Sequence, residues 1–209
     1  GNINWLMGSV GVSAQVPLTN LILPVGISFY TFQSMSYTID VYRGQLAPTR
    51  NPLHFFAYLA MFPQLVAGPI VRAVDLLPQL KHARPTDEAT RWDGARLIVY
   101  GFFKKVVVAD TVAATIATAF SAGAPLASCG YWWVIMTLFA FQIYCDFSGY
   151  SDIARGLAKW MGYDFPRNFN NPYVASSFRE FWARWHISLS TWFRDYVYRP
   201  LGGNRNSRA

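Results

Sequence analysis

Thr111 to Cys145 reads TVAATIATAFSAGAPLASCGYWWVIMTLFAFQIYC and contains no Asp, Glu, Lys or Arg. Two further uncharged runs cover Gly1 to Ile39 and Asn51 to Val71. A helix that crosses a bilayer needs roughly 20 mainly apolar residues, because the hydrocarbon core is about 30 Å thick. Two of the three runs exceed that length, and the run from Asn51 just reaches it. The pattern predicts an all-α fold, a polytopic bundle of transmembrane helices, in which residues 1–209 form a single membrane-embedded region.

The composition agrees with a membrane setting. Of the 209 residues, 53% are hydrophobic, 17% are aromatic and only 14% are charged, whereas a soluble domain carries nearer a quarter charged residues. The net charge of +7 comes from Lys and Arg that are spread through the loops. Basic residues near span ends set orientation and contact anionic lipid, and Trp and Tyr favour the membrane interface. We therefore expect membrane lipid as a partner and no nucleic acid.

Four apolar segments are candidates for crossing the bilayer: Leu18–Ile39, Leu53–Leu65, Leu97–Phe120 and Leu126–Phe147. Asp40 is expected to mark the exit of the first segment into water. The second is followed by Gly68 and Pro69, so a short span and a re-entrant segment both remain open. The third contains Lys104 and Lys105, and two adjacent lysines at mid-span would be costly. We expect these lysines to lie near an interface.

Two polar stretches differ in their expected structure. Arg72 to Arg96 contains prolines and several charges and is predicted to be a loop with one surface helix. Ser177 to Tyr198 is predicted to be one amphipathic helix, because Ser177 followed by Glu180 forms a capping box. Its apolar face would contain Phe178, Phe181, Trp182, Trp185, Leu189, Trp192, Phe193 and Tyr196. Its polar face would contain Glu180, Arg184, Ser188, Thr191 and Asp195, with Glu180 and Arg184 spaced to pair.

His186 lies at the boundary between the two faces of this helix. In one interpretation the helix lies in the membrane interface, and the histidine is a polar group there. In the other, His186 faces a polar channel and transfers a proton, because the ordinary pKa of histidine is about 6.5. The pattern leaves both interpretations open.

Tyr144 to Arg155 places ionisable and hydroxyl side chains directly after the long uncharged run. Asp146 and Tyr150 share one helix face, and Ser148 and Asp152 share another. Ionisable groups at membrane depth usually line a cavity, so these four side chains are candidates for substrate contact. In the alternative, Asp146 only marks the end of the span.

Several catalytic signatures are missing from the sequence. It contains no G-x-S-x-G elbow, no phosphate-binding glycine loop and no H-E-x-x-H zinc helix. His54, His82 and His186 are too scattered to predict a metal site. Serine-nucleophile, nucleotide-hydrolysing and metal-dependent hydrolase functions therefore lose support, and we expect no bound metal or cofactor.

Four longer stretches carry a resemblance to a known family. YCDFSGYSD at Tyr144–Asp152 and FWARWHISLSTWFRDY at Phe181–Tyr196 resemble signatures of the membrane-bound O-acyltransferase superfamily. LPVGISFYTFQ at Leu23–Gln33 and FPQLVAGPI at Phe62–Ile70 are similar to the bacterial branch that includes the alginate O-acetyltransferase membrane subunit. The resemblance extends over nearly the whole chain.

The resemblance implies a ring of helices around a tunnel in the bacterial cytoplasmic membrane. An acyl group, expected to be acetyl, would enter as a thioester of coenzyme A or of an acyl carrier. It would leave on hydroxyls of an extracytoplasmic polysaccharide, directly or through a relay protein. His186 matches one of two family histidines and is the predicted catalytic residue. The candidates for lining the tunnel are Asp146, Ser148, Tyr150, Asp152, Trp182, Arg184, Trp185 and Ser190.

The second family histidine, to which the resemblance assigns the central catalytic role, is expected downstream of Ala209. We therefore expect the chain to be the central part of a longer protein and to be inactive by itself. Two other functions remain open. A transporter or flippase also has broken spans and intramembrane charges, although the sequence shows no inverted repeat. A non-catalytic membrane scaffold would use the aromatic helix as an anchor.

Overall fold

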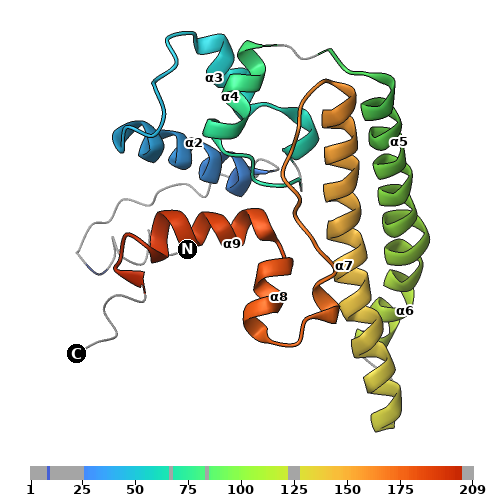
Figure 1. Cartoon of the computed structure of the whole chain (residues 1–209). Helices are drawn as coiled ribbons and strands as arrows, with labels where there is room; N and C mark the ends of the chain where they lie inside the picture. The colour runs from blue at the N-terminus through green and yellow to red at the C-terminus, as the bar shows by residue number, and fades with distance from the viewer. Residues whose placement is uncertain (1–8, 10–25, 66–67, 83–84, 122–127, 204–209) are drawn as a thin grey trace.

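The computed structural model describes residues 9, 26–65, 68–82, 85–121 and 128–203, and the regular elements in that part of the chain are all helical. A long antiparallel hairpin forms one side of the molecule (Figure 1). Its first arm is α5 (Glu88–Phe102), the π-helical segment η2 (Phe103–Asp110) and α6 (Thr111–Phe120), and its second arm is α7 (Cys129–Trp160). The shorter helices lie beside it: α2 (Ile27–Tyr42), α3 (Pro52–Leu59), η1 (Phe62–Gln64), α4 (Ala73–Lys81), η3 (Pro172–Val174), α8 (Phe178–Arg184), α9 (Ile187–Phe193) and η4 (Arg194–Tyr198).

Glycines bring the two arms of the hairpin into close contact. A Cβ atom added at Gly101 would lie 2.6 Å from the carbonyl oxygen of Gly149, and one added at Gly94 would lie 2.8 Å from that of Gly156. The two glycines on each helix are seven residues apart, which is about two turns, so they lie on one face. The two backbones therefore touch directly, and this contact fixes the register of the hairpin.

The expected spans correspond only in part to helices of the structure. Within the described residues, no helix combines the length and the apolarity that a bilayer crossing requires. The first expected span begins outside the described residues, and its remainder falls in α2. The second falls in α3 and η1, the third in the first arm of the hairpin, and the fourth in α7, which begins at Cys129.

Asp40 does not mark an exit into water. It lies inside α2 and is only 1% exposed. Its two carboxylate oxygens accept hydrogen bonds from the Tyr196 hydroxyl at 2.8 and 2.7 Å. A buried carboxylate needs such partners, and the partner here comes from a segment that is distant in sequence.

The prediction of a loop with one surface helix over Arg72–Arg96 was also wrong. The stretch contains α4 and the beginning of α5, and α4 belongs to the core, where Ala73, Leu76 and Leu77 are buried. Their spacing is that of an apolar helical stripe. The prediction missed the stripe because Pro78, which removes a helical hydrogen bond, was interpreted as part of a loop.

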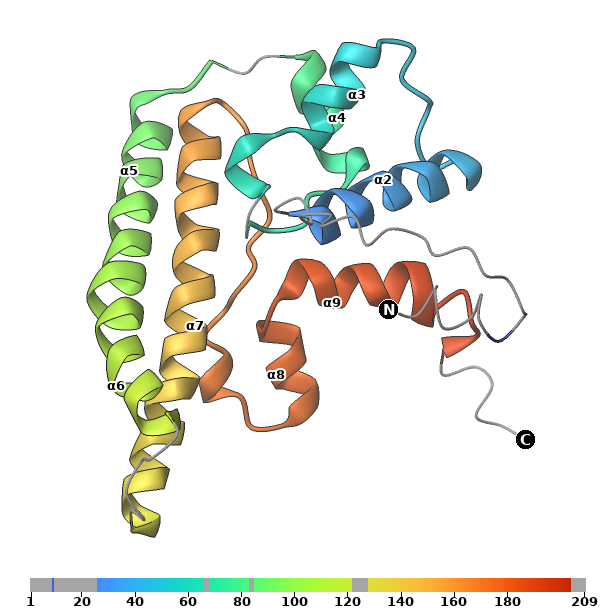
Figure 2. The same cartoon turned by 180° about the vertical axis from the view of Figure 1, so that it is seen from behind.

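The segment from Ser177 to Tyr198 is not one helix. α8 ends at Arg184, α9 begins at Ile187, and the two helices meet at a sharp angle (Figure 2). His186 lies at the junction with φ 42° and ψ 53°, in the left-handed region. The predicted N-cap is confirmed, since the Ser177 hydroxyl oxygen accepts a hydrogen bond from the Glu180 amide at 3.2 Å. The prediction of a single amphipathic helix was wrong.

Candidate functional site

The extended segment that follows α7 stabilises the break at His186. The amide of Asn170 donates to the carbonyl oxygen of Arg184 at 2.9 Å, and the amide of Ile187 donates to that of Asn168 at 2.8 Å. A left-handed conformation costs a residue other than glycine about 1–2 kcal/mol. These hydrogen bonds with another segment offset that cost. The helical pattern of Ser177–Tyr198 alone gives no sign of them.

The side chain of Asn168 joins three parts of the molecule. Its amide nitrogen donates to the Ser151 hydroxyl of α7 at 3.1 Å, and its amide oxygen accepts from the Ser188 hydroxyl of α9 at 2.9 Å. The Ser188 hydroxyl oxygen also accepts from the amide of Ile70 at 3.0 Å. All three side chains are buried. Ser188 was predicted on an outward polar face, and the break instead turns it into this network.

The His186 imidazole lies between two aromatic rings. Its centroid is 4.6 Å from that of Phe147, edge to face, and 6.4 Å from that of Phe169, stacked. Among the described residues its Nε2 atom is buried without a hydrogen-bond partner. Burial lowers the pKa of His186 to about 4, so the ring is neutral near pH 7. A neutral imidazole with an unpartnered nitrogen can accept a proton. The interpretation of His186 as a residue that faces a polar channel predicted polar neighbours, but its ring neighbours are aromatic.

The two predicted tryptophans lie in different environments. Trp185 packs among aromatic rings and stacks on Phe181 with centroids 5.5 Å apart. Trp182 also contacts Phe181, but it is 55% exposed. Aromatic packing therefore holds Trp185, the residue directly before His186, while Trp182 faces outward from α8.

Two other predicted residues bond to the backbone around the break. Arg184 forms the predicted ion pair with Glu180 at 2.6 Å and also donates to the carbonyl oxygen of Asn170 at 3.2 Å. The Ser190 hydroxyl donates to the carbonyl oxygen of Trp185 at 3.2 Å. Both side chains therefore position the backbone beside His186.

The polar residues of α7 face two lysines of η2. The ammonium group of Lys104 pairs with Asp152 and donates to the Ser148 hydroxyl at 3.1 Å. That of Lys105 pairs with Asp146 at 2.7 Å and lies 5.5 Å from the centre of the Tyr150 ring. The predicted division of these four α7 side chains between two faces is confirmed, because each face has its own lysine.

A cavity of about 720 Å³ lies beside these pairs, between the hairpin and the segment after α7. This volume is in the range of small-molecule sites, about 300–1,000 Å³. It is lined by Leu97, Tyr100, Phe103, Lys104, Val108, Phe141, Tyr144, Cys145, Asp152, Arg155, Arg167, Phe169 and Asn171. Asp152 is one of the predicted lining residues, and His186 lies behind the Phe169 ring.

Sequence reasoning did not identify Lys104 or Arg167 as cavity residues. A signal for Lys104 was present, because a lysine in an apolar stretch needs a carboxylate partner, and Asp146 and Asp152 are the nearby candidates. Arg167 follows the end of α7 and has no comparable signal. The prediction that the other seven polar and aromatic candidates line a tunnel stays a prediction.

Comparisons with known proteins point to one family. The family model described as membrane-bound O-acyltransferase matches residues 46–209. The chain is 48% identical to the probable alginate O-acetylase AlgI of Pseudomonas aeruginosa, over 99% of this chain and 39% of that protein. It is 36% identical to the peptidoglycan O-acetyltransferase of Helicobacter pylori, over 89% of this chain and 40% of that protein. It is 32% identical to the teichoic acid D-alanyltransferase of Bacillus subtilis, over 87% of this chain and 46% of that protein. The chain thus spans less than half the length of these relatives.

Proposed function

The chain belongs to the membrane-bound O-acyltransferase family, and we propose that it forms part of an enzyme that transfers an acyl group from a thioester to hydroxyls of a polysaccharide. One observation in the structure supports this proposal most strongly. The buried Nε2 atom of His186 has no hydrogen-bond partner among the described residues. A base for the attacking hydroxyl is the first requirement of acyl transfer.

In the proposed reaction, the hydroxyl oxygen attacks the carbonyl carbon of the thioester while His186 Nε2 accepts the hydroxyl proton. The carbon–sulfur bond then breaks, and the proton passes from the imidazole to the departing thiolate. The products are an ester and a free thiol. Cationic donors stabilise the charge that develops on the carbonyl oxygen, and Lys104 and Arg155 in the cavity wall are our candidates. Phe169 lines this cavity and its ring stacks on His186 with centroids 6.4 Å apart, so the proposed reaction requires this ring to move.

The setting that we propose is a multi-pass bundle in the bacterial cytoplasmic membrane. A thioester of coenzyme A or of an acyl carrier binds from the cytoplasmic side, and the acceptor lies outside, with a relay protein where one is used. The names of the relatives support a polymer acceptor, since they refer to alginate, peptidoglycan and teichoic acid. Two of the three names refer to acetyl transfer, which favours acetyl as the group.

The test uses bacterial membranes that contain the full-length protein. We expect label from acetyl-coenzyme A, carried on the acetyl group, to appear in alginate as a base-labile ester. Membranes from a strain that lacks the gene should not form this ester. Label that crosses the membrane without esterification would instead support a transporter. Equal esterification with and without the gene would contradict the proposal.

A further inference from the structure

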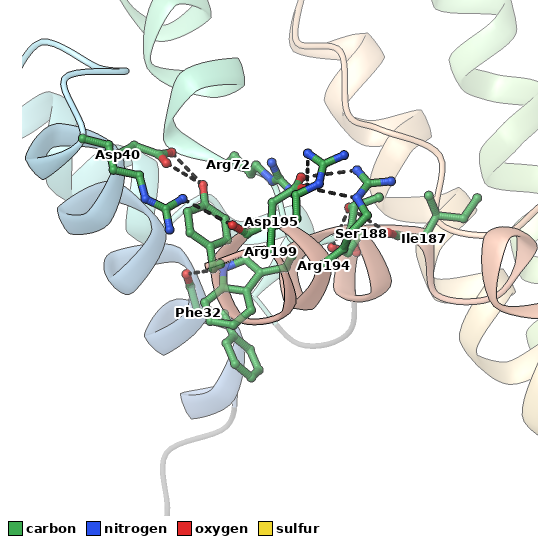
Figure 3. A network of polar contacts seen from close by, with 12 residues as sticks. Phe32, Asp40, Arg72, Ile187, Ser188, Arg194, Asp195 and Arg199 are labelled. Carbon is green, nitrogen blue, oxygen red and sulfur yellow. Dashed lines mark hydrogen bonds and ion pairs between the residues drawn. The ribbon is translucent and has the colours of Figure 1, made fainter. Parts of the chain in front are cut away.

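Arginines gather around Asp195 in η4, the segment that follows α9 (Figure 3). The Asp195 carboxylate pairs with Arg72 at 2.8 Å, with Arg194 at 2.9 Å and with Arg199 at 3.0 Å. Arg43 donates to the backbone carbonyl oxygen of Asp195 at 3.3 Å. Arg43 directly follows α2, Arg72 directly precedes α4, and the other two arginines lie after α9, so the fold assembles the cluster.

The charge of this cluster is not balanced. Burial by itself would raise the pKa of Asp195, but the hydrogen bonds from Arg194 and Arg72 outweigh it and lower the pKa to about 2. Asp195 is therefore fully ionised near pH 7, yet it supplies one negative charge to three guanidinium groups. The hairpin differs, because Lys104 and Lys105 each face a carboxylate of α7.

An open pocket of about 590 Å³ adjoins the cluster. Its lining consists of Arg43, Gln45, Arg72, Asp195, Tyr196, Arg199 and Pro200, with three guanidinium groups and one carboxylate. The Tyr196 ring forms its apolar wall, and the guanidinium carbons of Arg43 and Arg72 lie 5.5 and 5.1 Å from the ring centre. Hydrogen bonds from the Tyr196 hydroxyl to Asp40 fix that ring.

We infer that this pocket binds a phosphate group, either a phosphomonoester or a pyrophosphate. Guanidinium groups present paired N–H donors that match phosphate oxygens, and charge-assisted bonds of this kind are strong. A dianion would neutralise the two positive charges that remain when Asp195 is set against the three guanidinium groups of the pocket lining. The group belongs either to a soluble phosphorylated molecule or to a lipid headgroup. The inference stands apart from the proposed acyl transfer, because its test measures binding alone.

The test is calorimetric titration of the full-length protein, purified in a maltoside detergent, with pyrophosphate at pH 7.5. Arg43 and Arg199 are exposed, so their substitution should leave the fold intact, and the thermal unfolding midpoint checks this. We expect Arg43→Gln and Arg199→Gln each to weaken binding about tenfold, the equivalent of one charge-assisted hydrogen bond. Arg199→Lys keeps the charge but not the paired donors, and its loss should be smaller.

The matched control is Arg96→Gln on α5, an exposed arginine that pairs with Asp93 at 3.7 Å, which should bind pyrophosphate like the wild type. Nanodiscs with and without phosphatidic acid then identify the source of the phosphate. Loss of pyrophosphate binding only in phosphatidic acid discs assigns the pocket to a lipid headgroup, and equal binding in both discs assigns it to a soluble ligand. Absence of binding to the wild type, or equal binding by the wild type and both glutamine variants, overturns the inference.

Discussion

The hairpin and the segment from Ser177 to Tyr198 were both expected to contain helices, but only the arms of the hairpin continue without a break. In the hairpin, facing glycines bring two backbones together, and the π-helical η2 keeps the first arm continuous. In the C-terminal segment, the chain breaks at His186, where Asn168 and Asn170 supply hydrogen bonds from outside the helix. The comparison teaches that contacts with distant segments decide whether a helical pattern continues. The two continuous arms of the hairpin form the framework of the fold, and the break at His186 creates the candidate site.

The strongest way to disrupt the framework is to separate its backbones. Gly101→Ala places a Cβ atom 2.6 Å from the Gly149 carbonyl oxygen, so we expect the free energy of unfolding of the full-length protein to fall by about 2–3 kcal/mol. Denaturant titration measures the change. The matched control is Gly130→Ala, also in the hairpin, where the nearest atom is 3.9 Å away. The control should gain up to about 1 kcal/mol from helix propensity, and equal losses in both variants would contradict the close contact.

The break depends on Asn168. Asn168→Ala removes the partner of two buried hydroxyls, those of Ser151 and Ser188, and should lower the free energy of unfolding by about 2 kcal/mol. Asn51→Ala serves as the comparison, because it removes one exposed helix cap on α3 and should cost about 1 kcal/mol. A smaller loss at Asn168 than at Asn51 would show that the network does not hold the break.

The buried histidine should make stability depend on pH. Burial lowers the pKa of His186 to about 4 in the folded protein, while in the unfolded chain it is about 6.5. The unfolded state therefore binds a proton first, and stability falls as the pH drops from 6.5 towards 4. We expect a loss of about 2–3 kcal/mol across this window. Carboxylates also titrate there, so the measured quantity is the difference between the wild type and His186→Asn. Parallel curves for the two proteins would contradict a lowered pKa.

The smallest expected effect concerns a contact between the hairpin and the segment that leads into α8. The Tyr173 hydroxyl, in the segment before α8, donates to the Ala140 carbonyl oxygen of α7 at 2.6 Å. Tyr173→Phe should lower the free energy of unfolding by about 1 kcal/mol. Tyr42→Phe is the control, because Tyr42 is 90% exposed and should show no change. A Tyr173→Phe protein as stable as this control would mean that the hydroxyl does not stabilise the contact.

Structural features could be predicted from the sequence where the contacts that determine them lie close together along the chain. The spacing of Ser177 and Glu180 predicted the N-cap, that of Glu180 and Arg184 predicted their ion pair, and the helical period of α7 separated Asp146 from Asp152. The break could not be predicted, because Asn168 lies 18 residues before His186 and its hydrogen bonds depend on how α7 and α9 pack. α4 is a different case, because the spacing of its apolar residues does indicate a helix. The helix was missed only because Pro78 indicated a loop.

The family resemblance was confirmed by the comparisons. It matched His186 to one of the two family histidines, but it did not predict the left-handed conformation of this residue at the junction of α8 and α9. Backbone strain at a residue other than glycine often accompanies function. The residues around His186 stabilise that conformation through hydrogen bonds with distant parts of the chain.

The role of His186 as a base is tested most directly by polymer acetylation in full-length protein carrying His186→Asn. Asparagine tolerates the left-handed conformation but cannot act as a base, so the substitution separates backbone geometry from chemistry. We expect the acetylation rate to fall by about 100-fold or more, while His82→Asn, at an exposed histidine after α4, keeps the wild-type rate. A His186→Asn protein that inserts normally and acetylates at the wild-type rate would contradict this role.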